Sequence, residues 1–287
     1  PATADARTSA PVVRSAAADG IVLLDKPRGL SSNAALQRVK RAWGASKAGH
    51  AGTLDPLATG MLPILLGEAT KIAGHLLHKD KAYAVSCRLG QSTTTYDADG
   101  EVTCERQVPA IDPDRLHDLL AGFTGLVRQR APVYSAIKQG GQPLYRRARR
   151  GEEVVAPERE VRIDRIDVVS MPGGQLDLEV ECGSGTYIRS LVHDLGEALG
   201  CGAHVSALRR LWVSPFRDQP MVGLDEVLAG SRPLLPALAG LAGWPTVQLD
   251  QAAWLDVRQG RSIAVAHPDP GTGPVAAISP GDRKSVG

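Results

Sequence analysis

Residues 48–67 read AGHAGTLDPLATGMLPILLG, and this punctuated stretch constrains the fold more than any other part of the chain. It is too long and too irregular for a simple turn, so we expect a long ordered loop of the kind that carries function. The run GIVLLDK (20–26) before it predicts a buried strand that ends at a turn. The alternating segment KAYAVSCRLG (81–90) after it predicts a half-buried strand.

Outward from this stretch, apolar periodicity predicts helices and further strands. An N-cap at Ser31 or Ser32 opens a helix that Gly44 ends, and Thr186 is expected to cap a helix with an apolar stripe over 188–199. Because the strands are joined both by hairpin-like turns and by helices, we expect an α+β fold, a mixed sheet with helices packed on it. The remaining helices are expected at 68–78, 113–123 and 223–243, and the remaining strands within 160–182 and at 203–213.

Length and composition exclude several classes of protein. A chain of 287 residues with 43% hydrophobic and 22% charged residues has ordinary globular usage, so disorder is not expected. The four cysteines show no CxxC, which argues against a disulfide framework and a cysteine-rich zinc site. No apolar run is long enough for a membrane span, and no secretory signal is recognised. We expect a protein of a reducing compartment, the cytoplasm, with no membrane contact.

Composition also divides the chain into parts. Residues 1–19 are rich in Ala, Ser, Thr and Pro and predict a flexible N-terminal tail. Residues 20–243 carry the periodic segments and are expected to form the main domain. Residues 244–287 are expected to form a short C-terminal module, with an end that is rich in Pro and Gly.

The net charge of +2 hides a strong segregation of charge. Two windows, 26–54 and 128–150, hold thirteen Lys and Arg residues and no acid, so the rest of the chain sums to −11. Solvated faces would explain one such window, whereas two favour a surface for a polyanion such as nucleic acid. Glycine and proline within 128–150 predict a loop or insertion there.

Asp55 is the strongest candidate for chemistry. It is the first acid after a basic stretch, in GHAGTLDP (49–56), where glycines let the backbone approach a ligand and Pro56 favours an extended conformation. A lone carboxylate among cations should stay ionised, which suits a nucleophile or a base. The alternative is a turn or cap residue, the commonest role of Asp before Pro.

Other motifs are weaker. His75 and His78 have HxxH spacing, but no third ligand stands at a suitable distance, so histidines on a helix surface are the better interpretation and no metal site is predicted. The segment GSGT (183–186) lacks the Gly-Lys-Ser/Thr end of a phosphate loop. No GxSxG pairs with His and Asp in a recognisable order.

The segment GHAGTLDPLATGMLPILLGEATK (49–71) closely resembles the signature of the TruB-type tRNA pseudouridine synthases. The resemblance covers about residues 20–230 and implies the pseudouridine-synthase fold, a mixed, largely antiparallel sheet flanked by helices with the catalytic cleft across it. Further segments match in the family's order, namely LLDKPRGLSS (23–32), KAYAVSCRLG (81–90), YDADGEV (96–102), PVYSAIK (132–138), GSGTYIRSLVHDLGEALGCGAHVSALRR (183–210) and GLDEV (223–227).

The resemblance implies an isomerase that converts the uridine numbered 55 in the T loop of tRNA to pseudouridine, with no metal and no cofactor. The uridine would be flipped out of its stack into a pocket. Asp55 matches the catalytic aspartate, and Arg189 matches the arginine that pairs with it. Tyr83 matches the tyrosine that stacks on the base and helps to remove the final proton. Whether the aspartate attacks the ribose, attacks the base or removes a ribose proton stays open.

The resemblance also implies substrate-binding residues. Tyr187 and Leu208 would line the uracil pocket, and His50 would position RNA near the flipped nucleotide. Tyr83 lies on the apolar face of its predicted strand, so a packed core tyrosine is the alternative for that residue. The cations expected to contact phosphates are Lys26 and, in the second window, Arg146, Arg147, Arg149 and Arg150.

The chain departs from the family's pattern in two places. Thr94 stands where the family usually carries an Asp before YDADG, in the RNA-facing polar network. About 43 residues follow Trp244, which is short for the family's PUA-type RNA-binding domain, so we interpret 244–287 as a reduced PUA-like module.

Two alternatives to this enzyme differ from it in what they require. A non-catalytic tRNA-binding folding helper need not keep Asp55, Tyr83 and Arg189 together, so their presence favours the enzyme. The guide-RNA-dependent branch of the superfamily works with protein partners, whereas the tail and the short C-terminal module favour the stand-alone bacterial type. We therefore expect a monomer that binds the T-stem-loop of tRNA.

Overall fold

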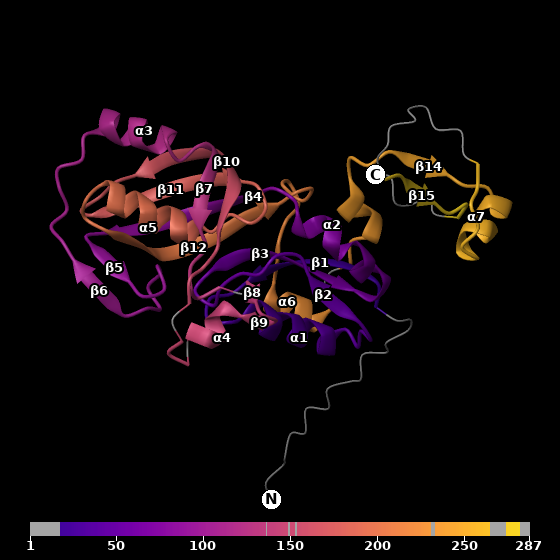
Figure 1. Ribbon diagram of the computed structural model, residues 1–287. Helices are drawn as coiled ribbons and strands as arrows, with labels where there is room; N and C mark the ends of the chain where they lie inside the picture. The colour runs from indigo at the N-terminus through magenta and orange to yellow at the C-terminus, as the bar shows by residue number, and fades with distance from the viewer. Residues whose placement is uncertain are drawn as a thin grey trace, which may run out of the picture.

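The computed structural model describes residues 18–135, 137–148, 150–152, 154–230, 233–264 and 274–281. Within these residues, nine strands form one large sheet in the order β13-β1-β3-β12-β4-β11-β10-β7, with β2 paired to β3 (Figure 1). The strands are β1 (Gly20–Lys26), β2 (Ala48–His50), β3 (Thr59–Leu66), β4 (Lys81–Leu89), β7 (Gly125–Arg130), β10 (Glu158–Ser170), β11 (Gln175–Cys182), β12 (Ala203–Val213) and β13 (Val222–Gly223).

Most neighbouring strands of this sheet are antiparallel. The pairs β1–β3, β2–β3, β4–β12, β4–β11, β10–β11 and β7–β10 run in opposite directions. The pairs β3–β12 and β1–β13 are parallel. The prediction of a mixed, largely antiparallel sheet is confirmed.

Helices pack on both ends of the sheet. Helix α5 lies beside β12 and β4. Helices α1 and α6 lie together, with α6 beside β1 and α1 beside β2 and β3 (Figure 1). Ser31 caps α1 as predicted, because its hydroxyl accepts a hydrogen bond from the Ala34 N–H. The helices are α1 (Ser32–Ala42), η1 (Gly67–Ile72), α2 (Ala73–Leu77), α3 (Pro113–Ala121), α4 (Leu144–Ala148), α5 (Ile188–Ala198), α6 (Leu224–Ala229), η2 (Ala237–Leu241) and α7 (Gln251–Arg258).

The apolar run of β1 is continuous because the strand is buried on both faces. Val22 and Leu24 pack into the main core cluster, together with apolar residues of α1 and α5. Ile21 and Leu23 pack into a second cluster on the other face, below η1 and α2. A strand that is covered on both sides needs no polar alternation.

The prediction of one long loop over 48–67 is wrong in extent. Residues 48–50 form β2 and residues 59–66 form β3, so the irregular part spans only 51–58. β3 keeps its place in the sheet despite Pro63, which pairs with Leu23 of β1. The apolar residues after Asp55 therefore build the sheet, and the loop is short and held at both ends.

Three smaller expectations also need correction. The N-cap of α5 is Tyr187, and the Thr186 hydroxyl instead donates to the Gly183 carbonyl at 3.1 Å. The segment 223–243 holds only the short helices α6 and η2, because prolines interrupt it. At the start of the chain, residues 1–17 lie outside the described residues, while Asp19 accepts a hydrogen bond from the Ala69 N–H at 3.1 Å and so belongs to the folded part.

Short strands outside the large sheet form three small pairs. Two of them, β5–β6 and β8–β9, are hairpins that extend from the main domain, and the third, β14–β15, is parallel and lies with α7 beyond the end of the large sheet (Figure 1). These strands are β5 (Gln91–Thr93), β6 (Val102–Glu105), β8 (Lys138–Gln139), β9 (Gln142–Pro143), β14 (Thr246–Gln248) and β15 (Ala276–Ile278).

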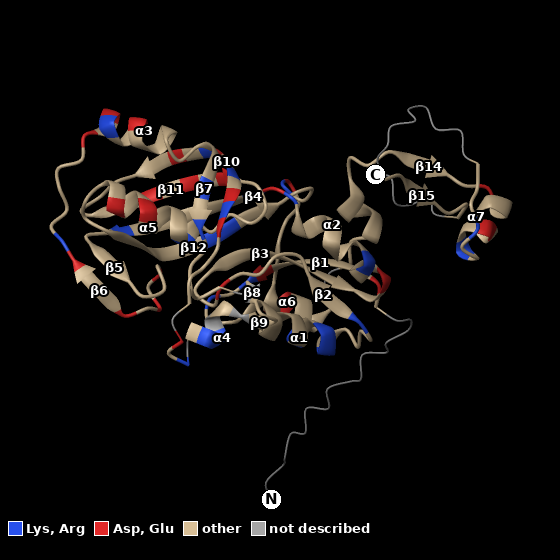
Figure 2. Ribbon diagram, in the orientation of Figure 1, with Lys and Arg blue, Asp and Glu red and all other residues tan. Residues whose placement is uncertain are grey.

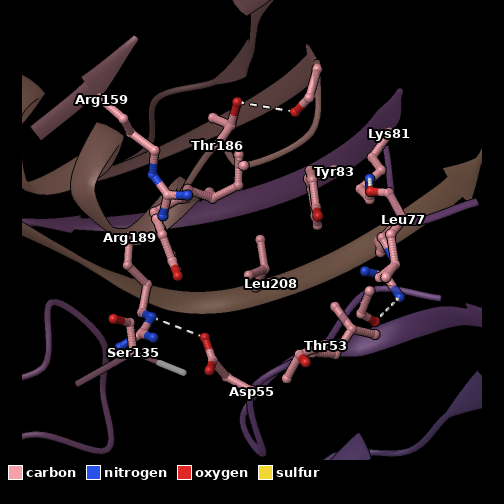
Figure 3. Close-up of a pocket in the computed structure, with 17 residues that line it drawn as sticks. Thr53, Asp55, Leu77, Lys81, Tyr83, Ser135, Arg159, Thr186, Arg189 and Leu208 are labelled. Atoms are coloured by element: carbon pink, nitrogen blue, oxygen red, sulfur yellow. Dashed lines mark hydrogen bonds and ion pairs between the residues drawn. The ribbon is translucent and has the colours of Figure 1, made fainter. Parts of the chain in front are cut away.

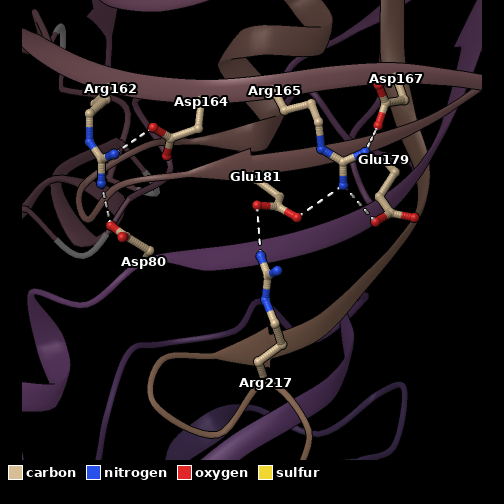
Figure 4. Close-up of polar contacts among 8 residues, drawn as sticks. All are labelled: Asp80, Arg162, Asp164, Arg165, Asp167, Glu179, Glu181 and Arg217. Atoms are coloured by element: carbon tan, nitrogen blue, oxygen red, sulfur yellow. Dashed lines mark hydrogen bonds and ion pairs between the residues drawn. The ribbon is translucent and has the colours of Figure 1, made fainter. Parts of the chain in front are cut away.

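A network of ion pairs covers the outer surface of β10 and β11 (Figure 4). Arg165 contacts three carboxylates of this network, and Arg217 joins it through Glu181 at 2.8 Å. Exposed pairs of this kind are each worth at most about 1 kcal/mol. Because acids outnumber arginines, this surface is unsuited to a polyanion. The network consists of Arg162, Arg165, Arg217, Asp80, Asp164, Asp167, Glu179 and Glu181.

The first testable prediction concerns Gly60, where β3 passes β12. A Cβ on Gly60 would lie 2.1 Å from the Arg210 carbonyl oxygen, and the residue has φ +96°. Gly29 has a similar φ of +86° with no atom within 4 Å, so it is a matched control for the backbone strain alone. We expect Gly29→Ala to cost about 1–3 kcal/mol and Gly60→Ala more than about 4 kcal/mol, measured by urea unfolding. Equal losses in the two variants would contradict the close approach of β3 and β12.

Candidate active site

A pocket opens between the loop 51–58 and the start of α5 (Figure 3). Its volume of about 260 Å³ suits a small group such as a single base. Among the described residues that line it, the one carboxylate is Asp55, and the cations are Lys81, Arg159, Arg189 and Arg210. The pocket therefore offers one acid in positive surroundings.

The loop that carries Asp55 is held by its backbone. The buried Ser32 hydroxyl accepts from the Leu54 N–H at 2.7 Å and donates to the Leu54 carbonyl at 2.9 Å. The Gly29 N–H donates to the Pro56 carbonyl at 2.7 Å. Both residues that flank Asp55 are thus hydrogen-bonded to the segment 27–32, so this segment fixes the position of the loop 51–58.

Arg189 holds the Asp55 side chain. Arg189 is 5% exposed, and its Nε lies 2.9 Å from Asp55 Oδ2 (Figure 3). Its Nη1 donates to the Thr95 carbonyl at 2.9 Å, and its Nη2 donates to the Tyr134 carbonyl at 3.0 Å. The expected contact between Arg189 and Asp55 is confirmed, and the remaining donors of the arginine are fixed by backbone.

A second carboxylate, which the sequence analysis missed, lies behind this pair. Asp97 is 4% exposed, and its Oδ2 lies 3.4 Å from Arg189 Nη1. Its Oδ1 accepts from the Asp99 N–H at 3.1 Å, which fixes its direction. Asp55 is therefore not a lone carboxylate, because one guanidinium serves two acids.

These neighbours change the acidity of Asp55. Burial raises the pKa of the Asp55 carboxyl, the Arg189 guanidinium acts against this rise, and the Asp97 carboxylate adds to it. The side chain keeps 37% of its exposure, which faces the pocket. Asp55 is thus a more basic carboxylate than a solvated aspartate, held by an arginine and open on one side.

Tyr83 is both a core residue and a pocket residue. It is 7% exposed on β4, packs in the main core cluster and lines the pocket, so the two interpretations of its sequence position hold together. Burial raises the pKa of the Tyr83 phenol, and the guanidinium of Arg210 acts against that rise. Arg210 is the cross-strand neighbour of Tyr83 on β12.

Arg210 is a fully buried cation that sequence analysis did not single out. Its Nε donates to the Met61 carbonyl at 2.7 Å and its Nη2 to the Gly52 carbonyl at 3.1 Å, so it braces the loop 51–58 from both ends. Its Nη1 is buried with no hydrogen-bond partner among the described residues. Gly52 has φ +85° and leaves room for this nitrogen.

The expectation that Lys26 contacts phosphates is wrong for this structure. The Lys26 side chain is 0% exposed, and its Nζ donates to the Pro27 and Leu30 carbonyls at 3.0 and 2.7 Å. Burial lowers the pKa of Lys26 to about 8, although the Asp55 carboxylate acts against this. Burial likewise lowers the pKa of Lys81, in the pocket wall, to about 8. Lys26 acts on the site through its charge, because it lowers the pKa of the Asp55 carboxyl.

The pocket wall that faces the loop 51–58 is formed by the turn before α5 and by β12. Tyr187 and Leu208 line the pocket, which is the position expected for residues that contact uracil. The buried Gln129 amide fixes the Tyr187 backbone, because it donates to the Tyr187 carbonyl at 3.0 Å and accepts from the Tyr187 N–H at 2.7 Å. The Arg159 guanidinium lies 4.8 Å from the centre of the Tyr187 ring.

His50 lies outside the described lining of this pocket. It is half-buried on β2, and its Nδ1 is buried with no hydrogen-bond partner among the described residues. Burial lowers the pKa of His50, and the Arg210 guanidinium adds to the effect. A neutral imidazole beside the loop is compatible with the expected contact to RNA, which stays a prediction.

The basic segment 128–150 is attached to the pocket wall. Leu144, at the start of α4, is buried in a small apolar cluster against which Tyr187 packs. Arg147 and Arg150 both pair with Glu152, at 2.7 Å each, and these pairs are exposed. Arg146 lies on α4, and Arg149 lies outside the described residues. Figure 2 shows Lys and Arg on α1 and α4, and Asp and Glu on β11 and α5.

The missed residues differ in what the sequence could reveal. Asp97 stands in the quoted segment YDADGEV (96–102), so its motif was a usable signal. Thr94, the departure noted in that region, is exposed, and its hydroxyl accepts from the Glu101 N–H at 3.2 Å. Arg210 ends the quoted segment 183–210, so its motif was a usable signal as well. For Gln129 no local signal existed, because its burial follows from the pairing of distant strands.

Neither a candidate metal site nor a candidate membrane span is found among the described residues. No group of three His, Cys, Asp or Glu side chains in the described part of the chain could hold a metal ion. Within the same residues, no helix has the length and apolar character needed to cross a bilayer.

Two family descriptions match the chain. Residues 40–188 match the TruB family pseudouridylate synthase N-terminal domain, and residues 189–232 match the tRNA pseudouridylate synthase B C-terminal domain. A tRNA pseudouridine synthase B of Xylella fastidiosa is 54% identical over 252 residues, which cover 85% of this chain and 83% of the relative. One of Nitrosococcus oceani is 51% identical over 254 residues, covering 86% and 82%.

Solved structures share the fold. The structure of a Cbf5-Nop10-Gar1 complex matches with a TM-score of 0.69 and 28% identity, over 91% of this chain and 74% of that one. An H/ACA RNP bound to a substrate RNA that contains 2′-deoxyuridine matches with a TM-score of 0.67 and 25% identity, over the same shares. The predicted pseudouridine-synthase fold is confirmed, and with the length of the family matches these findings show that the chain belongs to the TruB family of pseudouridylate synthases.

Proposed function

We propose that this chain is a tRNA pseudouridine synthase that isomerises the uridine numbered 55 in the T loop of tRNA. The relatives of 54% and 51% identity bear the name tRNA pseudouridine synthase B. The observation that carries the proposal is the pocket in which Asp55, paired with Arg189 at 2.9 Å, faces the space beside Tyr83.

The reaction is an isomerisation, so it consumes no co-substrate and uses the protein's own side chains. The C1′–N1 bond of the uridine breaks, a C1′–C5 bond forms, and a proton leaves C5 while N1 gains one, so the product is an isomer. The step needs a group that acts on the uridine and a group that moves the C5 proton. The pocket offers a candidate for each.

Asp55 acts on the flipped uridine as nucleophile or base. Burial raises the pKa of this carboxyl, which makes it a stronger base, and the Arg189 guanidinium keeps it ionised and oriented. The Tyr83 ring supplies a stacking face for uracil. Its hydroxyl, next to Arg210, relays the C5 proton: the oxygen accepts that proton while the hydroxyl proton passes to water, so the phenol is restored.

The proposed RNA path follows the basic surfaces. Tyr187 and Leu208 contact the uracil, and His50 positions the RNA beside the loop. The cations of α1 and α4 contact phosphates of the T-stem-loop, since they gather on elements next to the pocket (Figure 2). The acidic surface of β10 and β11 repels RNA and so favours this path.

The proposal includes the chain's organisation and setting. Residues 20–243 form the catalytic domain, and 244–287 belong to a PUA-like module. The chain acts as a monomer in the cytoplasm, where tRNA is found. Identity of 54% to a tRNA pseudouridine synthase B, against 28% to the Cbf5 complex, favours stand-alone action over the guide-RNA-dependent branch.

Asp55→Asn tests the proposal directly. We expect it to bind unmodified tRNA transcript normally and to lose more than about a thousand-fold in single-turnover rate, because the amide keeps the shape but is neither nucleophile nor base. The measurement is pseudouridine mapping after incubation with the transcript. Asp164→Asn, on the outer ion-pair network, is the control and should keep wild-type activity. Full turnover by Asp55→Asn would remove Asp55 from the mechanism, whereas no turnover by the wild type would support a non-catalytic RNA binder instead.

Substitutions of Tyr83 distinguish its proposed stacking role from its proposed role in proton transfer. We expect Tyr83→Phe to bind tRNA normally but to lose about a hundred-fold or more in single-turnover rate, because the hydroxyl is absent. Tyr83→Leu should also weaken capture of the flipped base, since stacking is worth about 1–3 kcal/mol per base. Melting temperatures measured beside the rates show whether packing alone accounts for the losses. A stable and fully active Phe variant would remove the hydroxyl from the mechanism.

The basic segment should govern the salt dependence of binding. Replacing Arg146, Arg147 and Arg150 by Gln should reduce the slope of log K against log salt by roughly 0.7 to 0.9 for each phosphate that is no longer neutralised. The matched control replaces Arg162, Arg165 and Arg217 by Gln, which removes the same charge from the outer surface. A larger reduction in the control than in the α4 variant would place the RNA on the surface of β10 and β11 instead of on α4.

A further inference from the structure

We propose that the stacked rings of Tyr96 and His193 are a positioning pair that holds Arg189, and through it Asp55, in the reactive arrangement. The inference rests on the proposed pseudouridine synthase activity. The two rings have centroids 3.9 Å apart and planes inclined by 8°. Tyr96 belongs to the loop between β5 and β6, and His193 belongs to α5, so the stack joins two elements that are distant in the sequence.

Both neighbours of Tyr96 contact Arg189. The Thr95 carbonyl accepts from Arg189 Nη1 at 2.9 Å, and Asp97 Oδ2 lies 3.4 Å from the same nitrogen. A shift of the Tyr96 backbone would move a carbonyl and a carboxylate relative to the guanidinium at once. The direction of the Arg189–Asp55 contact therefore depends on where Tyr96 sits.

His193 is the residue one helical turn after Arg189. Residues four apart on a helix lie on the same side, so the ring of His193 stands beside the Arg189 side chain on α5. The stack thus holds the β5–β6 loop against the same face of α5 from which the Arg189 side chain extends to Asp55.

The backbone at Tyr96 shows that this position is enforced. Tyr96 has φ +63°, and it is the one residue other than glycine with a positive φ in the described part of the chain. Such a conformation persists only where surrounding contacts determine it, and it occurs preferentially at functional sites. On its other side the loop is held by β12, through Val205 N–H to the Tyr96 carbonyl at 3.1 Å and Ala98 N–H to the Val205 carbonyl at 2.9 Å.

A stacking platform for RNA is the other use of exposed aromatic rings, and the geometry favours positioning. Both rings are half-buried, and each uses one face against the other. His193 Nδ1 is buried and has no hydrogen-bond partner among the described residues, so the imidazole is enclosed on that edge. Two acids, Asp194 and Glu197, and one cation, Arg130, lie close enough to act on the Tyr96 phenol, so the rings do not lie on a cationic surface of the kind that binds phosphates.

The test is a set of ring deletions with conservative replacements. Tyr96→Gly removes the ring and relieves the positive φ, and His193→Ala removes the other ring while it favours the helix. Each variant should lose about ten-fold in single-turnover rate with unchanged tRNA affinity, and the double variant should lose no more than either single one. Tyr96→Phe and His193→Phe keep a stack and should keep the rate within about two-fold of wild type.

The outcomes separate the possibilities. Unchanged rates in Tyr96→Gly and His193→Ala overturn the proposal, whether or not the melting temperature falls. Weaker tRNA binding at an unchanged rate also overturns it and assigns the rings to RNA contact. Additive losses in the double variant would show that the rings act separately. His75→Ala, which removes an edge-to-face contact with Trp244, is the matched control and should keep the wild-type rate.

The proposed function is tested separately in the same experiment. If the wild type produces no pseudouridine, the function fails, and the rates of the variants carry no information about the stack. If the wild type is active and the ring deletions match it, the positioning pair fails and the function stands.

Discussion

The guanidinium of Arg189 is the group on which the site depends. It is nearly inaccessible to solvent, and it touches Asp55, Asp97 and two backbone carbonyls. A buried cation is costly unless it is paired and hydrogen-bonded, so these contacts are needed for the arginine to be there at all. They also join four parts of the chain that are far apart in sequence: the loop 51–58, the loop between β5 and β6, the segment around Tyr134, and α5. The site therefore forms only when these four parts of the chain come together.

A second buried guanidinium, that of Arg210, also lines the pocket and has a different structural role. Arg189 binds the Asp55 side chain, whereas Arg210 binds the backbone at both ends of the loop that carries it. Gly52 and Gly60 leave the space for this arginine and for its strand. Two glycines of the signature segment are thus explained by close packing, Gly52 against the Arg210 guanidinium and Gly60 against the Arg210 backbone. The carboxylate is fixed at its side chain and at its backbone.

Local patterns predicted the elements that local chemistry determines. The strands 20–26 and 203–213 were predicted with the bounds that β1 and β12 have, and the cap at Ser31 followed from a serine before an apolar stripe. β3 was hidden because Gly60 and Pro63 are atypical of strands, and its place in the sheet comes from β1 and β12 on either side. The pairing of Asp55 with Arg189 came from the resemblance and not from periodicity. The burial of Lys26 could not be predicted from the sequence. A lysine after an apolar run gives no sign that its ammonium will donate to two backbone carbonyls and lie near the Asp55 carboxylate in the folded protein.

The buried lysines beside the pocket couple binding to protons. Lys26 and Lys81 have pKa values of about 8, so each is only partly protonated in mildly alkaline solution. Under the proposed function, RNA phosphates bound next to the pocket stabilise the charged form of both lysines and raise both pKa values. Binding near pH 8 then takes up protons from the buffer, and by linkage the apparent affinity falls as the pH rises through that region. The measured heat of binding would accordingly include the ionisation enthalpy of whichever buffer supplies those protons.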